Sequence, residues 1–328
     1  MGAKPRINKY DNLKGIAIFL VVLCHFNFLG LLGGSINKFI FMIHLPLLFF
    51  VAGYFSKIGP DEPIKSFKRL LIPYIIFCAI TRLFNWLVLG HFNFDMIFIK
   101  PSFALWFLIA LFLMKMALPI VNKFKYPILI SIICALFIGL INIESSILGL
   151  TRAFGYFPIF LVGFYFKQTK NGLSTQYEKI VNLFNKHYKL IGLLIIILII
   201  IVCIRFDNRV ILFKKAYVGN PIKEVIKRLI VILLQIGAVL IFDKLMTNRN
   251  CLLTKFGINS MAVYILHCYV RLYLDATLPK SFISNPILGL VFTFGLAFIV
   301  TYVFSRDAVS KYLNKFTDGI YDLIVKPN

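Results

Sequence analysis

The chain has 328 residues, of which 60% are hydrophobic and only 15% are charged, and its mean hydropathy is +0.86. This composition excludes a soluble protein, because a soluble domain of this size must present a largely polar surface to water. The formal net charge of +23 lies mainly between apolar runs, where Lys and Arg orient membrane helices and bind anionic lipid headgroups. We therefore expect membrane lipids, and no nucleic acid, among the partners of this chain.

Apolar runs recur along the chain and predict an all-α fold, namely a polytopic integral membrane helical bundle. Gly, Pro, Asn and charged residues mark the breaks between the runs. About ten transmembrane spans are predicted, in chain order at 13–33, 37–56, 70–89, 102–120, 126–143, 152–167, 188–204, 225–245, 257–274 and 285–304. Since no stretch is long and polar enough for a soluble domain, we expect a single membrane domain over residues 1–328. Its core lies at about 10–304, and residues 305–328 form a cytoplasmic tail.

The distribution of Lys and Arg predicts that the N- and C-termini are both cytoplasmic, because cytoplasmic segments of membrane proteins carry an excess of basic residues. The outer segment 205–228 is an exception to this rule. It carries seven basic residues: Arg205, Arg209, Lys214, Lys215, Lys223, Lys227 and Arg228. Either this segment binds an anionic substrate outside the membrane, or the number of spans near it differs from the prediction.

The first span begins with "YDNLKGIAIFLVVLCHF", which places the ionisable His25 far inside an apolar run. At a rise of about 1.5 Å per residue, His25 lies about 16 Å along the helix from Lys14, near the bilayer centre. Their separation is close to three helical turns, so Lys14 and His25 share one face, together with Asp11. This face leads from the cytoplasmic rim to the middle of the membrane.

Two more histidines and an arginine are predicted at a similar depth on other spans. His44 lies about 10 Å inside the second span, His267 lies near the middle of the ninth, and Arg82 lies near the middle of the third. A cation in hydrocarbon costs several kcal/mol, whereas a single neutral histidine is explained by a hydrogen bond between helices. Three histidines at one level favour a shared polar cavity that opens to the cytosol, with His25 at its border.

A second group of polar residues is predicted at the cytoplasmic ends of several spans: Lys14, Arg69, Lys115, Asn259 and Ser260. Cations at a low-dielectric rim concentrate polyanions, which favours a phosphate-binding vestibule. Ordinary snorkelling of Lys68 and Arg69 toward lipid headgroups explains part of the same pattern. Charge alone does not distinguish coenzyme A from a nucleotide or a lipid phosphate.

Five segments together resemble acyltransferase family 3, and most closely its fucose 4-O-acetylase-like branch. In chain order they are "DNLKGIAIFLVVLCH" with Lys14 and His25, "FMIHLPLLFFVAGYF" with His44 and Pro46, "KRLLIPY" with Arg69 and Pro73, "ALWFLIALF" with Trp106, and "FGINSMAVYILH" with Gly257, Asn259, Ser260, Tyr264 and His267. Each segment alone is a weak signal, but all five occur in the right order between residues 10 and 304. Three features depart from the family pattern. Lys14 replaces the commoner Arg and lacks its bidentate fork, Ala52 replaces Ser, and only two residues separate Tyr264 from His267.

The resemblance implies an O-acyltransferase of the plasma membrane. Such an enzyme moves an acetyl or other acyl group from cytoplasmic acyl-CoA to a hydroxyl of a cell-envelope sugar, polysaccharide or lipid-linked glycan. Acetyl-CoA is then the expected donor substrate, and no metal is expected. A sugar hydroxyl is a poor nucleophile at neutral pH, so it needs a general base, and histidine has a suitable pKa. We expect His25 to be that base, or to carry a transient acetyl group instead.

The resemblance and the predicted depths together assign roles to the other candidate residues. Lys14 and Arg69 are expected to bind the donor with Lys115, Asn259 and Ser260. We expect His44 and His267 to orient His25 or bind the acceptor, and Arg82 to stabilise the thioester oxyanion. Trp106, Tyr264 and Arg271 are expected to bind the acceptor, although Trp106 equally fits an aromatic belt at the membrane interface.

Two other classes of membrane protein share these general features. A transporter or flippase for a glycan or lipid-linked precursor also needs many spans and buried polar residues, but it usually shows internal repeats and intramembrane carboxylates. The histidine-bearing segments do not repeat one another, and the predicted spans hold almost no carboxylates. A membrane scaffold or sensor is the third alternative.

Overall fold

The computed structural model describes residues 7–27, 33–90, 96–141, 147–170, 178–214, 216–278 and 286–325, and all regular structure in these ranges is helical. The elements are α1 (Asn8–His25), α2 (Gly33–Phe55), α3 (Glu62–Ser66), η1 (Phe67–Leu71), α4 (Ile72–Leu89), α5 (Trp106–Val121), α6 (Pro127–Phe137), η2 (Ile138–Leu140), α7 (Leu150–Lys170), α8 (Glu178–Arg205), α9 (Asn208–Ile211), α10 (Pro221–Leu245), α11 (Leu252–Ile258), α12 (Ser260–Thr277), α13 (Pro286–Phe304) and α14 (Asp307–Ile324). The predicted all-α fold is therefore confirmed.

Five helical segments of the described chain are long and apolar enough to cross a membrane: Gly34–Phe55, Glu62–Val88, Lys186–Arg205, Pro221–Leu245 and Ile287–Phe304. The prediction of a helical membrane protein is confirmed at this level. Every predicted span overlaps a helix, but the number of about ten spans stays a prediction. Residues 28–32, 142–143 and 285 of the predicted spans, and Lys215 of the basic outer segment, lie outside the described residues.

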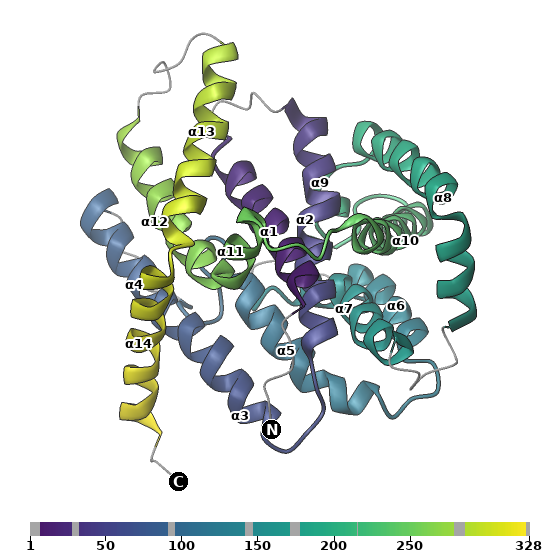
Figure 1. The fold of residues 1–328 in the computed structure, drawn as a ribbon, viewed down its shortest axis with the longest axis horizontal. Coiled ribbons are helices and arrows are strands. Elements are labelled where there is room, and N and C mark those ends of the chain that lie inside the picture. Colours follow the sequence, from purple (N-terminus) through teal and green to yellow (C-terminus); the bar gives the residue numbers. More distant parts are fainter. Residues whose placement is uncertain are drawn as a thin grey trace.

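Helix α1 lies inside the bundle, where it packs against α2, α11, α12 and α13 (Figure 1). The crossing of α1 and α11 is close because each helix presents a glycine to the other. A Cβ atom on Gly15 would meet the carbonyl of Leu253, and one on Gly257 would meet the carbonyl of Asp11. Small residues allow this approach of two backbones, and the resulting contact fixes the position of the helix that carries Lys14.

Helices α2 and α7 meet in the same reciprocal manner. A Cβ atom on Gly53 would lie 1.9 Å from the carbonyl oxygen of Phe160, and one on Gly163 would lie 2.0 Å from that of Phe50. Both distances are far shorter than van der Waals contact, so only glycine fits at these two positions. The pair thereby holds α2 and α7 at a close backbone distance.

The first helix ends earlier than the predicted span at 13–33. The helix stops at His25, with Phe26 as its C-cap, so His25 is the last helical residue and does not lie in the middle of a longer helix. A distant side chain satisfies the terminal carbonyl, since Arg271 Nη1 donates to the His25 carbonyl oxygen at 2.7 Å. This hydrogen bond supplies the partner that the next helical turn would have provided.

The ninth predicted span, 257–274, is interrupted near its start. Asn259 separates α11 from α12, and its side-chain amide donates to the Ser305 carbonyl at 2.7 Å and to Asp307 Oδ1 at 2.8 Å. The amide therefore ties this break to the junction of α13 and α14. The Asn259 side chain, which is predicted to bind the donor, is therefore engaged in a contact between helices.

Residues 305–328 contain a helix that the sequence analysis does not predict. Helix α14 packs against α4 and α12 and runs beside them in Figure 1. Lys68 joins α14 to η1, because its Nζ lies 3.2 Å from Asp318 Oδ1, 3.6 Å from Asp322 Oδ1 and 4.5 Å from the ring centre of Tyr321. The division of the chain into a membrane core and a cytoplasmic tail stays a prediction.

Candidate active site

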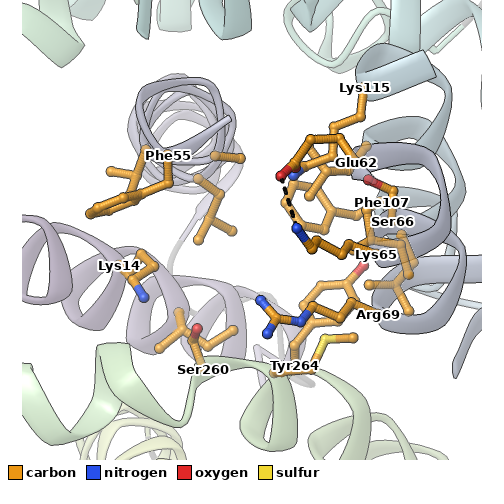
Figure 2. Close-up of a pocket in the computed structure, with 18 of the residues that line it drawn as sticks. Lys14, Phe55, Glu62, Lys65, Ser66, Arg69, Phe107, Lys115, Ser260 and Tyr264 are labelled. Carbon is orange, nitrogen blue, oxygen red and sulfur yellow. Dashed lines mark ion pairs between the residues drawn. The ribbon is translucent and has the colours of Figure 1, made fainter. Parts of the chain in front are cut away.

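A cavity of about 540 Å³ brings five of the predicted site residues together. Lys14 comes from α1, Arg69 from η1, Lys115 from α5, and Ser260 and Tyr264 from α12 (Figure 2). The sequence predicts each of these residues only by its position along a span. The structure shows that the spans are arranged so that the five side chains face one space.

The lining of this basic cavity carries an excess of positive charge. Five cationic side chains line it, against one carboxylate, that of Glu62; the cations are Lys14, Lys57, Lys65, Arg69 and Lys115. Glu62 lies 3.9 Å from Lys65, as Figure 2 shows, and Lys14 pairs with Asp11 at 2.9 Å. Arg69 and Lys115 form no ion pair with any described residue. Both cations are thus available for an anionic ligand.

Arg69 lies in a π-helical turn, Phe67–Leu71, between α3 and α4. Such turns are rare and occur most often at functional sites, because the extra residue in the turn redirects the side chains. Here the guanidinium group of Arg69 extends into the cavity, on the side opposite Lys14 (Figure 2). The preceding residue, Lys68, contacts α14 instead. In this turn, two consecutive cations therefore face different neighbours, the cavity and the C-terminal helix.

His25 and His267 form a hydrogen-bonded pair next to this cavity. His25 Nδ1 lies 2.7 Å from His267 Nε2, and the two rings stack with centroids 4.9 Å apart. On its other side, His267 Nδ1 lies 2.9 Å from the carbonyl oxygen of Val263. The carbonyl can only accept, so His267 Nδ1 carries hydrogen, and Nε2 of the neutral ring accepts from His25 Nδ1. This chain leaves the Nε2 lone pair of His25 free to accept a proton.

His25 and His267 do not line the basic cavity, contrary to the expectation that His25 borders a chamber open to the cytosol. Tyr264 lines the cavity, and its ring lies 6.1 Å from that of His267. The Tyr264 hydroxyl donates to the carbonyl of Ala104, which fixes the ring between the cavity and the histidines. The cavity therefore ends at Tyr264, one side chain before the pair.

His44 is buried but is not part of the pair. Its Nδ1 lies 2.8 Å from the carbonyl oxygen of Ile40, one turn earlier on α2, and its ring lies 5.5 Å from that of Phe41. No hydrogen bond joins His44 to His25 or His267 among the described residues. The contact with Ile40 is the satisfied-histidine arrangement that the sequence analysis kept as the alternative for any single histidine.

Arg82 lines a different cavity, of about 340 Å³, so the structure does not bring it into the basic cavity. The lining of this second cavity also includes Asn85, Ser102 and Phe103. The Phe103 ring lies 4.9 Å from the His25 ring, edge to face. Arg271 contacts the backbone of His25 and pairs with Asp275 at 2.7 Å. Arg271 thus contacts His25 directly, whereas Arg82 is connected to it only through Phe103, and both arginines lie outside the lining of the basic cavity.

Trp106 contacts a residue that the sequence analysis did not single out. The guanidinium carbon of Arg152 lies 4.4 Å from the Trp106 ring centre, in cation–π geometry, and Arg152 Nε is buried without a hydrogen-bond partner among the described residues. Arg152 also acts on Lys214 of the basic segment 205–228. Burial of Lys214 and the positive charge of Arg152 together lower the pKa of Lys214. An arginine at the start of a span that Gly155 and Pro158 interrupt was the available signal for this position.

Residues of the basic segment 205–228 line a third cavity, of about 310 Å³, at the ends of α8 and α10. Its charged lining residues are Arg205, Arg209, Lys227 and Arg228 with Asp207 and Glu224. Two of the cations are paired, Arg209 with Asp207 at 3.1 Å and Lys227 with Glu224 at 2.6 Å. The choice between an anion site and a different number of spans stays open here.

A metal site is not evident in the part of the chain that the structure describes, since it holds no group of three or more His, Cys, Asp or Glu side chains that could bind an ion. The expectation that no metal takes part stays a prediction.

The chain is similar to known proteins of one family. Residues 7–306 match a family model described as an acyltransferase domain. The Nodulation protein NolL of Sinorhizobium fredii is 30% identical over 193 residues, which cover 51% of this chain and 50% of NolL. The chain thus spans about half the length of this relative. No solved structure matches the chain.

Proposed function

Because the chain belongs to the acyltransferase family whose model covers residues 7–306, we propose that it is a plasma-membrane O-acyltransferase acting on a cell-envelope sugar. Family membership makes the chain an acyltransferase, the enzyme class predicted from its sequence. The proposal adds an acyl-CoA donor, preferably acetyl-CoA, on the cytoplasmic side. It also adds a sugar, polysaccharide or lipid-linked glycan as the acceptor, and the likeness to the fucose 4-O-acetylase-like branch.

One observation carries the assignment of the base. The chain of hydrogen bonds from the Val263 carbonyl through His267 to His25 leaves the Nε2 lone pair of His25 available. A general base needs such a lone pair, held in a fixed direction and within hydrogen-bond reach of the proton that it removes. His267 is then a positioning residue, because it acts on the acceptor only through His25.

The basic cavity supports a donor that carries phosphate groups. Its excess of cations suits the diphosphate and the ribose phosphate of coenzyme A, and neither Arg69 nor Lys115 forms an ion pair with a described residue. Lys14 and Ser260 complete the predicted donor group, whereas Asn259 has a structural contact instead. With a cytoplasmic N-terminus, the cavity opens on the side where acyl-CoA is present.

The proposed reaction is a direct acyl transfer. His25 Nε2 accepts the proton of the acceptor hydroxyl while that oxygen attacks the carbonyl carbon of the thioester. The C–S bond then breaks, and the coenzyme A thiolate takes the proton from His25. The thioester must reach past Tyr264, so the ring of Tyr264 moves aside during the cycle. The variant in which His25 itself carries the acyl group uses the same nitrogen and remains an alternative.

The transporter or flippase alternative is not favoured, because the family match concerns acyl transfer over nearly the whole chain.

The test uses membranes that contain the full chain, radiolabelled acetyl-CoA and a panel of envelope glycans. We expect label to move to a glycan hydroxyl, and to be released by mild alkali as an ester is. His25→Ala should lower transfer about 10²- to 10⁴-fold at an unchanged protein level. Absence of transfer to every glycan would refute the proposed function, and normal transfer by His25→Ala would refute the assigned base.

A further inference from the structure

We infer that the cavity beside Arg82 binds a sugar unit that carries an anionic group, and that this unit belongs to the acceptor. The inference rests on the proposed function, because it names the class of acceptor and the place where it binds. It is carried by unsatisfied polar groups, by charge, and by the position of the cavity relative to His25.

Three buried polar atoms around this cavity have no hydrogen-bond partner among the described residues. They are Arg82 Nε, Asn85 Oδ1 and Ser102 Oγ, and all three residues line the cavity. A buried polar group without a partner costs about 1–3 kcal/mol, so three in one place need an explanation. A polar ligand held in the cavity that all three residues line would supply it.

The kinds of atom favour a ligand that both donates and accepts hydrogen bonds over a bare phosphate. The guanidinium of Arg82 can only donate, the amide oxygen of Asn85 can only accept, and the hydroxyl of Ser102 can do both. The oxygens of a phosphate diester only accept, so a phosphate alone leaves Asn85 Oδ1 unsatisfied. Sugar hydroxyls both donate and accept, and therefore match the whole set.

Arg82 favours an anionic substituent on that sugar. It lines the cavity and forms no ion pair with any residue that the structure describes. Arg82 is also placed within the predicted third span, where a cation is expensive unless it serves a ligand or a partner. A carboxylate or phosphate group on the sugar would supply the counter-charge, and arginine binds such groups through two parallel hydrogen bonds.

The position of the cavity connects it to the proposed base. Phe103 lines the cavity, and its ring packs edge to face on His25 at 4.9 Å. The backbone of Phe103 has a φ of 46°, an unfavourable region for a bulky residue, and the next residue, Ala104, accepts the hydrogen bond from Tyr264. The segment 102–104 therefore separates three features: the Arg82 cavity, His25, and the end of the basic cavity.

The size of the cavity fits one sugar unit. Its volume of about 340 Å³ is near the lower end of the range for small-molecule sites, about 300–1,000 Å³. We therefore expect the cavity to hold the anionic sugar, while a neighbouring hydroxyl of the same glycan reaches His25 past Phe103.

The test measures binding without an acyl donor, so it does not depend on transfer. Purified full-length protein in detergent is titrated with two oligosaccharides that differ only in one unit, glucuronate or glucose, and binding is followed by calorimetry. We expect the glucuronate form to bind at least tenfold more tightly. Arg82→Gln should remove this preference, Arg82→Lys should restore part of it, and Ser102→Ala should weaken both ligands. Arg249→Gln removes a cation from an exposed loop outside the cavity and serves as the matched control.

Several outcomes would overturn the inference. They are equal binding of the two oligosaccharides, a preference that survives in Arg82→Gln, and displacement of the glucuronate form by phosphatidylglycerol micelles. The last result would assign the cavity to a lipid headgroup. If binding follows the expectation but no acyl group is ever transferred, the proposed function fails and the binding site stands. If transfer proceeds with an unchanged preference in Arg82→Gln, the binding site fails and the proposed function stands.

Discussion

His25 and His267 are joined through one nitrogen of each ring, Nδ1 of His25 and Nε2 of His267, at 2.7 Å. The hydrogen bond at the far side of His267, to the carbonyl of Val263, decides which nitrogen of each ring holds hydrogen. The backbone of α12 thereby sets the tautomer of a side chain at the end of α1. The same helix caps α1, because Arg271 binds the carbonyl of His25. Two contacts from α12 thus fix both the position and the tautomer of His25.

Replacement of His267 should impair turnover more than donor binding. His267→Phe removes the acceptor for His25 Nδ1, so the His25 ring loses its fixed tautomer and orientation, and we expect kcat to fall about 100-fold with little change in KM for acyl-CoA. His267→Gln offers an amide oxygen in place of Nε2 and should restore part of kcat. The measurement is steady-state transfer with both substrates varied. Equal losses in the two variants, or a loss confined to KM, would contradict the positioning role.

Replacement of Arg69 should affect the donor instead. Arg69→Gln removes a cation that has no ion-pair partner among the described residues, and hydrogen bonds to charged groups contribute about 1.5–3 kcal/mol. The KM for acyl-CoA should therefore rise about 10- to 100-fold, while kcat at saturating donor changes little. Lys311→Gln, on the exposed surface of α14, is the control for loss of charge. A donor KM equal to that of the native protein would remove Arg69 from the donor site.

A methyl group added at the α2–α7 contact should destabilise the fold. In Gly163→Ala the new Cβ atom would lie 2.0 Å from the carbonyl oxygen of Phe50, so the two helices must separate. Overpacking of this kind costs about 1–3 kcal/mol, which thermal unfolding in detergent detects as a lower Tm. Gly295→Ala is the matched control, because nothing lies within 4 Å of the position of its Cβ atom. Equal Tm values for the two variants would show that the contact is looser than described.

Loss of the Tyr264 hydroxyl should weaken the wall between the basic cavity and the histidines. Tyr264→Phe removes the side-chain donor to the buried carbonyl of Ala104, which keeps only the backbone hydrogen bond from Phe107 N at 3.3 Å, at a cost of about 0.5–1.5 kcal/mol of stability. The free energy of unfolding in detergent measures this cost. Tyr302→Phe, which removes an exposed hydroxyl that accepts from Arg306 at 3.1 Å, should change stability by less than about 0.5 kcal/mol. A Tyr264→Phe protein as stable as Tyr302→Phe would show that this hydrogen bond does not hold the ring in place.

The features predictable from the sequence are those that depend on residues close together along the chain. The helices follow from apolar runs and their breaks, and the meeting of Lys14, Arg69 and Lys115 follows from their places near one end of three spans. The pairing of Lys14 with Asp11 also follows from helical spacing, since the two lie one turn apart on α1.

The features that escaped prediction depend on contacts between distant residues. The end of α1 at His25 depends on Arg271, which lies 246 residues later, and the closure at Tyr264 depends on Ala104, 160 residues earlier. No sequence pattern within a single span predicts either of these two contacts. The depth of Arg82 along its span can be counted from the sequence, but the cavity that its side chain lines cannot, and its role at the oxyanion stays a prediction. The break at Asn259 was hidden for the same reason, since its partners Ser305 and Asp307 lie beyond the next helix.

The ion pairs of Lys68 connect the last helix to the turn that carries Arg69. Lys68 and Arg69 are consecutive residues of one π-helical turn, and the first is anchored by Asp318 and Asp322 while the second faces the basic cavity. Loss of α14 would remove both carboxylates that pair with the residue next to Arg69. A change at this end of the chain therefore bears on the turn that supplies one wall of the basic cavity.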